Sequence, residues 1–446
     1  MSDVYIFGAG PTGLTLAWIY GSSGRKVTVI EKYNKVGGSW ATKWSPDGLF
    51  TQHSPQILST AYVNTFALFE EMRIDKNRFL QPYESSWRDM DIEIVDYMVL
   101  GAAYMDHLVR SLHDVTVADY FKGSLSTKGE SAVEGLCYLL DGVPPSVLTV
   151  GELFGTFDQT AFYSTLEMSK ASDDTSGMGT LWQAALEKVG VEFRFDEELE
   201  TIEHVADGSF RFTTSKESMS VAYPSEIILS IDPSGLVGVL DRSPTLKDNW
   251  GVNQREHLTK GIYNSLSIQF HLGDSGYSVT PDTAKGMSTE WGIICVEVPS
   301  TVTGSHGTTL SSTILNIDHV KGLDMEGVKK EAWRQIRKAN PDLPEQPNEV
   351  TIGEGTTWSE AGGWEFDLSA SAHTTLGPFP SRGVLPCISI VGPINKRRFG
   401  ATTMEAAVES AKLHTCQSIS HSFTISALFA LLILITFAIL IRRYWY

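Results

Sequence analysis

The sequence predicts an α/β fold with a second, α+β part and a single membrane helix at the carboxyl end. Three observations support this prediction. The first residues alternate between apolar strand-like and helical patterns around a glycine-rich turn, residues 76–176 carry mainly helical patterns, and residues 423–441 contain no charged side chain. A chain of 446 residues is long enough for two or three domains of about 150 residues each.

Composition and charge exclude several classes of protein. The chain has 35 Lys and Arg against 53 Asp and Glu, a formal net charge of −18, so binding to a phosphate backbone is excluded as its main activity. The four cysteines are scattered at Cys137, Cys295, Cys387 and Cys416. They form neither a disulfide framework nor a metal-ligand pattern. We therefore expect no metal site and no nucleic-acid partner.

The first 31 residues form a predicted βαβ unit. Val4 to Phe7 and Val27 to Ile30 are strand-like, and a helix pattern runs from Leu14 to Tyr20 between them. The connecting turn is Gly8-Ala9-Gly10-Pro11-Thr12-Gly13, the glycine pattern of a Rossmann dinucleotide site. In such a turn the first glycine permits the sharp bend, the second lets the backbone approach a pyrophosphate, and the third lets the helix pack on the sheet. Glu31 closes the second strand, where an acid can bind the adenosine ribose.

A second glycine motif follows this acid. The run Glu31-Lys32 to Gly37-Gly38-Ser39-Trp40, followed by His53-Ser54, resembles the second glycine motif of glutathione-reductase-type flavoproteins. The resemblance implies noncovalent FAD on a Rossmann domain of that type. The implied contacts in this half of the site are Gly8, Ala9, Gly10, Pro11, Thr12, Gly13, Glu31, Lys32, Gly37, Gly38, Ser39, Trp40, His53 and Ser54.

Later segments resemble the amine oxidase and phytoene desaturase superfamily. They are Gly177 to Leu181 with Leu199, Ile227 to Pro233, and Ile388 to Pro393 with Thr403 to Ser410. The resemblance implies that the backbone of Leu199 contacts adenine. It also implies that Gly392, Pro393 and the helix start at Thr403, Met404 and Glu405 lie at the flavin ring, where a helix N-terminus stabilises reduced flavin.

Departures from that family bear on the reaction. The strand-like segment 263–272 lacks the lysine that amine oxidases hold near the flavin, and Lys260 lies just outside it. Thr403 stands where monoamine oxidases have a tyrosine, and Pro393 with Ile394 replaces a polar pair. Residues 369–374 contain no cysteine, which argues against covalent flavin. The substrate of the expected hydride transfer, from a C–N or C–H bond, therefore stays open.

Histidines and glycines leave further alternatives. His53, in the flavin-side segment, is the candidate catalytic base, whereas His271 and His373 fit structural roles. An NADPH-dependent flavin monooxygenase would need a second Rossmann unit, and Gly177-x-Gly179 and Gly353-x-Gly355 do not stand in a strand–turn–helix context. The third alternative is a non-catalytic structural membrane protein that retains the fold.

The predicted organisation interleaves two domains. Residues 1–75, 177–240 and 376–415 form the FAD-binding domain, 76–176 a mainly helical insertion of the substrate domain, and 241–375 its sheet and helix. Residues 416–422 are a polar linker, and 423–441 span roughly 28 Å as a transmembrane helix. We expect a single-pass C-terminal anchor with the body facing the cytosol, and a small-molecule substrate. The sequence makes no prediction of the oligomeric state.

Overall fold

The computed structural model describes most of the chain. The described residues are 2–44, 48–53, 56–83, 92–110, 112–141, 143–160, 166–169, 177–205, 207–250, 255–256, 258–259, 262–273, 289–298, 307–353, 355–366, 370–371, 379–382, 385–397 and 403–420.

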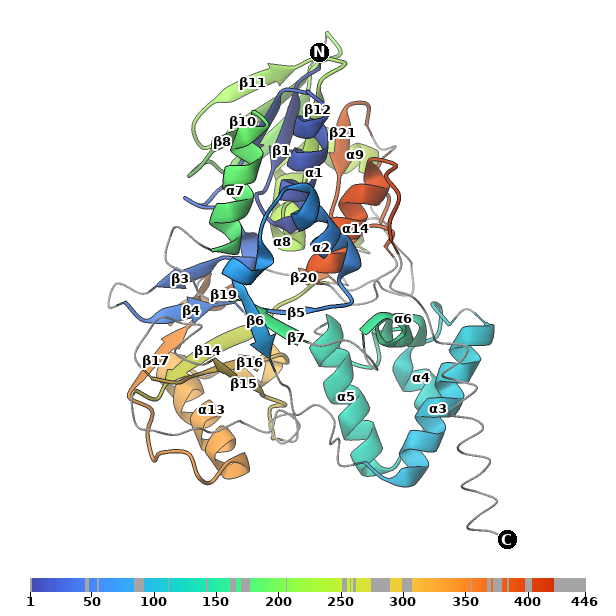
Figure 1. The fold of residues 1–446 in the computed structure, drawn as a ribbon, viewed down its shortest axis with the longest axis vertical. Coiled ribbons are helices and arrows are strands. Elements are labelled where there is room, and N and C mark those ends of the chain that lie inside the picture. The colour runs from blue at the N-terminus through green and yellow to red at the C-terminus, as the bar shows by residue number, and fades with distance from the viewer. Residues whose placement is uncertain are drawn as a thin grey trace.

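A five-stranded parallel sheet organises the amino-terminal part of the molecule. Its order is β21-β12-β1-β2-β8, and Figure 1 shows the sheet with α1, α7 and α14 beside it. The strands are β1 (Val4–Phe7), β2 (Val27–Ile30), β8 (Glu192–Arg194), β12 (Glu226–Leu229) and β21 (Ile388–Ile390), and the helices are α1 (Pro11–Ser22), α7 (Met178–Lys188) and α14 (Met404–His414). The sheet thus joins segments from both ends of the chain. Both faces of this sheet are covered by other elements, which explains why β2 is buried at every position.

A three-stranded antiparallel sheet lies over the other side of this region. It comprises β9 (Leu199–His204), β10 (Phe210–Thr214) and β11 (Ser218–Val221), followed in the chain by α8 (Pro233–Arg242) and α9 (Pro244–Trp250). Phe212 of β10 packs edge-on against Phe7 of β1, with ring centroids 5.0 Å apart. This contact belongs to one continuous core that links the two sheets.

A third sheet, of four antiparallel strands, lies in the lower half of Figure 1 together with α13 (Met325–Ala339). Its order is β15 (Ile294–Val298), β16 (Thr309–Ile314), β14 (Leu266–His271) and β17 (Glu349–Ile352). Trp333 and Ile336 of α13 pack on Phe270 and Leu310 of the sheet. The short strands β3 (Thr42–Trp44) and β4 (Phe50–Gln52) connect the two halves, since the Thr51 hydroxyl donates to Gln269 Oε1 at 3.0 Å.

A group of helices forms the third part, separated from the four-stranded sheet in Figure 1. It contains α3 (Ile94–Val109), α4 (Val117–Phe121), α5 (Thr127–Asp141) and α6 (Val150–Thr160), with its own apolar core. The small sheet β5-β7-β6 connects it to the rest, through β5 (Ile57–Ser59), β6 (Leu80–Tyr83) and β7 (Leu166–Ser169).

The remaining elements are short or peripheral. They are α2 (Val63–Glu71), β13 (Ile262–Tyr263), β18 (Thr356–Ser359), β19 (Gly363–Phe366), β20 (Ala370–Ser371) and the 3₁₀ turns η1 (Gly38–Trp40), η2 (Lys76–Arg78) and η3 (Ile317–Val320).

The mixed α/β class with a Rossmann-like parallel sheet is confirmed. The predicted mainly helical segment 76–176 contains α3, α4, α5 and α6, but its strands β6 and β7 were not predicted. No helix in the described part of the chain is long and apolar enough to cross a membrane. The predicted transmembrane helix at 423–441 lies outside the described residues.

Candidate cofactor-binding site

The two predicted glycine turns lie against each other at the carboxyl end of β1. The Gly37 amide donates to the Ala9 carbonyl at 2.9 Å, and a Cβ added to Gly38 would lie 3.1 Å from Gly10 Cα. Gly37 and Gly38 have positive φ angles of 123° and 57°, a backbone conformation that would be strained for a residue with a side chain. Ser39 and Trp40 continue the second turn as η1, and the Trp40 carbonyl accepts a hydrogen bond from Gln56. The second motif is therefore fixed onto the first by backbone contacts.

The three glycines of the first turn have different surroundings. A Cβ on Gly8 would lie 2.3 Å from the Ser230 carbonyl oxygen, and one on Gly13 would lie 2.0 Å from that of Gly8. A Cβ on Gly10 would meet nothing within 4 Å, and Gly10 has an ordinary extended backbone with φ of −75°. Gly8 and Gly13 are thus required by the packing of the protein itself. The space beside Gly10 is where a ligand can approach the backbone.

The start of α1 opens onto the same space. Its N-cap is Gly10, so no side chain caps the amides of the first turn, and Pro11 occupies the first helical position. The first turn, which includes Thr12 and Gly13, contains no acidic residue. An uncapped helix N-terminus of this kind favours an anion such as a phosphate.

Glu31 is buried at the end of β2, with 6% of its surface exposed. Its carboxylate accepts hydrogen bonds from the Ala9 amide at 2.6 Å and the Tyr33 amide at 3.0 Å. Burial raises the pKa of this carboxyl, and the two backbone donors oppose the shift. Beside it, the Lys32 ammonium lies over the Tyr33 ring, 4.8 Å from the centroid. Glu31 therefore connects the first glycine turn to the second strand, next to the predicted ribose position.

The carboxyl-terminal segment reaches the same region through α14. Thr403 is the N-cap of α14, where its hydroxyl accepts from the Ala406 amide at 3.4 Å, and it also hydrogen-bonds to the Tyr62 side chain. Met404 is fully buried. The Tyr62 contact was not predicted, because Tyr62 lies far from Thr403 in the sequence.

The side chain of Glu405 is bound within the protein, by residues of α2. Its buried carboxylate accepts from the amide and side chain of Asn64 at 2.9 and 2.8 Å, and from the amide and hydroxyl of Thr65 at 2.9 and 2.7 Å. The side chain therefore binds the first turn of α2, where a negative charge is stabilised. Its backbone at the start of α14 is what stays available to a cofactor.

A second turn precedes α14. Beyond β21, the Gly392 amide donates to Asn395 Oδ1 at 2.7 Å, and Asn395 Nδ2 donates to the Phe379 carbonyl at 3.1 Å. The Pro393 carbonyl accepts from the Arg397 guanidinium, and a Cβ on Gly392 would meet nothing within 4 Å. Asn395 was not among the predicted site residues of this turn, which were Gly392 and Pro393.

Comparisons with known proteins agree with this geometry. Residues 6–72 match the family model described as an NAD(P)-binding Rossmann-like domain. A putrescine oxidase redesigned for cofactor binding has a similar structure, at 14% identity and a TM-score of 0.65, covering 93% of this chain and 98% of its own. Cyclohexylamine oxidase from Brevibacterium oxydans is 14% identical with a TM-score of 0.64, and the match covers 93% of this chain and 98% of the oxidase. An oxidoreductase from Methanosarcina mazei is 12% identical with a TM-score of 0.62, and the match covers 93% of this chain and 100% of that protein. No protein in the curated sequence comparison matches.

The chain therefore shares the fold of these three proteins, two of which are amine oxidases. Within this fold, β14 carries the buried Gln269 on the strand that lacks a lysine, and its amide donates to the Gln52 carbonyl at 3.1 Å. Lys260, Ser54 and His373 lie outside the described residues.

Among the histidines, His53 follows β4, the strand that connects the five-stranded and four-stranded halves of the molecule. It is half-buried, no described residue hydrogen-bonds to it, and burial lowers its pKa. A neutral imidazole can accept a proton. His271, by contrast, is held between the hydroxyls of Thr309 and Thr351 at 3.1 and 3.0 Å, as a structural histidine would be.

Leu199, the predicted adenine contact, begins β9. Its side chain is buried in the core, and its carbonyl accepts from Arg242 Nη2 at 3.5 Å. Its backbone therefore stands at the edge of the three-stranded sheet, adjoining α8.

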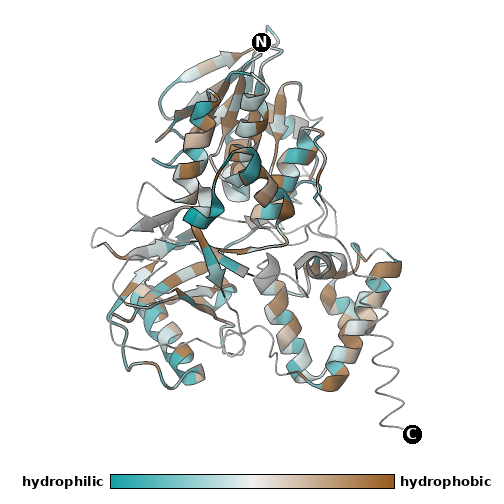
Figure 2. Ribbon diagram, in the orientation of Figure 1, coloured by the Kyte–Doolittle hydropathy of each residue, from teal (hydrophilic) through white to brown (hydrophobic). Residues whose placement is uncertain are grey.

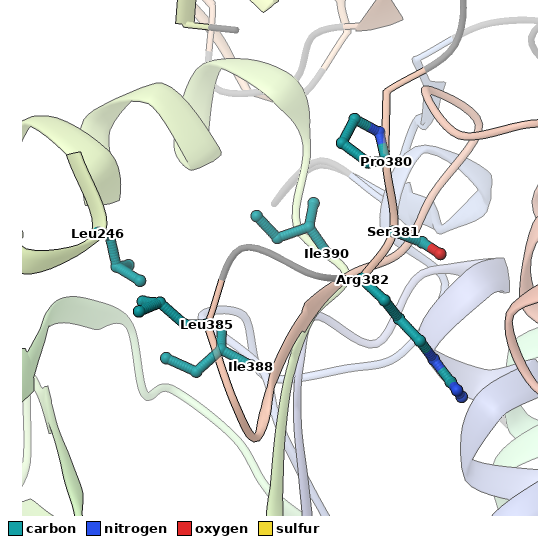
Figure 3. Close-up of a pocket in the computed structure, with 7 residues that line it drawn as sticks. All are labelled: Leu246, Pro380, Ser381, Arg382, Leu385, Ile388 and Ile390. Atoms are coloured by element: carbon teal, nitrogen blue, oxygen red, sulfur yellow. The ribbon is translucent and has the colours of Figure 1, made fainter. Parts of the chain in front are cut away.

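A small hollow elsewhere in the fold is not the candidate site. It has a volume of roughly 10 Å³, room for about one water molecule, and lies beside the edge strand β21. Figure 3 shows Leu246, Leu385, Ile388 and Ile390 gathered on one side of it, with Arg382 pointing away from them. Its apolar lining and size suit neither a nucleotide nor a substrate.

Proposed function

We propose that this protein is an FAD-dependent oxidoreductase of the amine oxidase superfamily, anchored to a membrane, that takes a hydride from a C–N or C–H bond of a small molecule. The observation that supports it best is the junction of the two glycine turns. They touch through Gly37 and Ala9, and the space beside Gly10 stays open at the uncapped start of α1.

The residues present fit noncovalent FAD. The backbone of Gly10 and Gly38 and the first-turn amides of α1 would hold the pyrophosphate, and Glu31 would accept from the ribose hydroxyls. The Leu199 backbone would contact adenine. Gly392, Pro393 and the start of α14 at Thr403 and Met404 would face the ring system, as in a glutathione-reductase-type domain built from 1–75, 177–240 and 376–415.

When bound, FAD supplies a two-electron acceptor for a hydride from the substrate. The protein's own residues do the rest. The half-buried imidazole of His53 is neutral near pH 7 because burial lowers its pKa, so it can accept a proton. The segments 76–176 and 241–375 would bind the substrate and exclude water from it. Without a lysine on β14, we expect a larger or more apolar substrate than a small primary amine.

Membrane attachment is part of the same proposal. Residues 423–441 are uncharged and are followed by Arg442 and Arg443 with three aromatic residues. This composition is typical of a tail anchor with an interfacial belt, with the body on the cytosolic side. On the amino side, Ser420 is held by Asn64, whose Oδ1 accepts from the Ser420 amide at 2.8 Å.

Anaerobic reduction of the purified protein tests the reaction. We expect bound flavin that NADPH does not bleach and that benzylamine reduces slowly, with faster reduction by a substrate found among larger amines and polyenes. Rapid stoichiometric bleaching by NADPH would favour the monooxygenase alternative. Flavin that stays oxidised with every amine, amino acid and polyene tested would favour a non-catalytic structural protein.

A further inference from the structure

Helix α3 exposes an apolar stripe along its whole length. Of the eight large hydrophobic side chains that the described residues expose, six lie on this helix. They are Ile94 (78% exposed), Val95 (46%), Tyr97 (45%), Met98 (45%), Leu108 (38%) and Val109 (84%). Figure 2 shows the hydrophobic colour on α3 at the edge of the helical group. Such a cluster on one element marks a contact surface.

The spacing makes the stripe continuous. Ile94, Met98, Gly101 and Leu108 follow one another at helical intervals of three, four and seven residues, with Met105 half-buried between the last two. Every position of α3 that is exposed, 94, 95, 97, 98, 101, 102, 108 and 109, is uncharged.

The charged groups of α3 point elsewhere and are already bound. Asp96 is fully buried and accepts from the Ser126 hydroxyl at 2.6 Å. Asp106 accepts from Arg110 Nε at 2.6 Å and from the Tyr120 hydroxyl at 2.8 Å. The opposite face packs into the helical core through Ala103. The helix is therefore apolar on both faces, and the large apolar side chains of its outer face are 38–84% exposed.

We propose that this stripe lies in the surface of the lipid bilayer that the carboxyl-terminal segment enters, an inference that rests on the membrane anchor of the proposed function. The chain after Ser420 contains 423–441, an uncharged stretch that would hold the body at a bilayer. Once the body is tethered, a modest apolar surface suffices for a second contact, because binding becomes intramolecular.

The dimensions and the charge favour this occupant. With 16 residues, α3 extends roughly 24 Å, too short to cross a hydrocarbon core of about 30 Å, so it would lie in the plane of the interface. An exposed face without charges needs no polar partner and loses nothing on entering the acyl-chain boundary. The aromatic ring of Tyr97 suits the interface, where aromatic residues with a polar group are enriched.

Fluorescent labelling of the full chain in vesicles tests the proposal. Cys416 is the exposed native cysteine and is replaced by serine, and single cysteines are introduced as Met98→Cys, Val109→Cys and, as a control, Tyr223→Cys. Tyr223 is also an exposed apolar residue, at 82%, but it lies between β11 and β12, and Figure 1 shows both strands far from α3. Each protein is labelled with an environment-sensitive fluorophore and reconstituted into phosphatidylcholine vesicles.

The proposal predicts that a nitroxide on the lipid acyl chain quenches the fluorophores at positions 98 and 109 at least about twice as strongly as the one at position 223. This is expected for a helix that lies about 5–10 Å deep in the interface. Iodide should quench only position 223. If the protein floats with the vesicles and iodide quenches all three positions equally, the α3 contact is overturned while the anchor stands. Shielding of positions 98 and 109 from both quenchers also overturns it, and shows that the 423–441 segment or a second copy covers the stripe. Failure to float with vesicles overturns the anchor and the α3 contact together, whereas the flavin spectrum still tests the oxidoreductase.

Discussion

Replacing Glu405 by alanine should strongly destabilise the fold. The carboxylate accepts four hydrogen bonds from Asn64 and Thr65 at 2.7 to 2.9 Å, two of them from backbone amides of α2. Removing it leaves two buried amides without an acceptor, at about 1–3 kcal/mol each, and removes a charge from a helix N-terminus, at about 0.5–1 kcal/mol. The two side-chain donors can turn to other partners. We therefore expect a loss of about 3–6 kcal/mol in the free energy of unfolding.

Denaturant unfolding, followed by circular dichroism on the full chain in detergent, measures this loss. Glu405→Gln keeps the shape and one acceptor oxygen and should lose about half as much. Glu360, exposed in the turn between β18 and β19, gives the matched control, because Glu360→Ala should change the free energy of unfolding by less than about 0.5 kcal/mol. If Glu405→Ala unfolds within about 1 kcal/mol of the wild type, the carboxylate does not connect α14 to α2 as described.

Three further changes have separate readouts. Burial and then the charge of Arg382 lower the pKa of His414 to about 4, so the folded state favours the neutral ring. The free energy of unfolding should be at its full value above pH 6.5 and fall by up to about 3 kcal/mol as the pH drops towards 4. In His414→Leu this acid-induced loss should be smaller. A variant that loses as much stability in acid as the wild type would contradict the role of His414. Asn395→Ala leaves the Gly392 amide without its acceptor, so it should weaken FAD binding, measured by flavin titration, and lower the free energy of unfolding, each by about 1–3 kcal/mol. Asn395→Asp keeps an acceptor oxygen for this amide and should lose less. Deleting 423–446 should release a flavin-loaded body, and sedimentation with carbonate-washed membranes would point to another anchor.

The site's amino-terminal half could be predicted because its signals are local. Gly8, Gly10 and Gly13 are needed within one turn, and the structure shows a different reason for each. The clash of a Gly13 Cβ with the Gly8 carbonyl follows from the tight turn itself. The contact of Gly37 with Ala9 extends this to the second motif, which lies nearby in the sequence.

The long-range contacts could not be predicted in the same way. The acid of the closing motif, Glu405, resembles a cofactor ligand in the sequence, but its partners Asn64 and Thr65 lie some 340 positions earlier. Nothing in the α2 sequence indicates that its first turn needs a carboxylate from the other end of the chain. Asn395 is similar, because its role depends on Phe379 across a turn.

Aromatic and helical patterns also left real ambiguity. The local sequence does not indicate the partners of Trp364, which lies in the β18–β19 hairpin. Its indole donates to the Leu323 carbonyl at 3.0 Å, and its ring packs on the core of the four-stranded sheet. In α3 the sequence showed a helix but not which face is buried, because apolar residues occur on all sides.

Flavin content of wild type and Gly10→Val tests the central claim most directly. Gly10 has an extended backbone and no atom within 4 Å of an added Cβ, so valine should leave unfolding unchanged within about 1 kcal/mol while placing a side chain in the phosphate space. We predict a visible flavin spectrum with stoichiometric FAD in the wild type, and its loss in a well-folded Gly10→Val protein. A wild type that takes up no FAD on reconstitution, or a Gly10→Val protein that keeps its full complement after gel filtration, would contradict the proposed site.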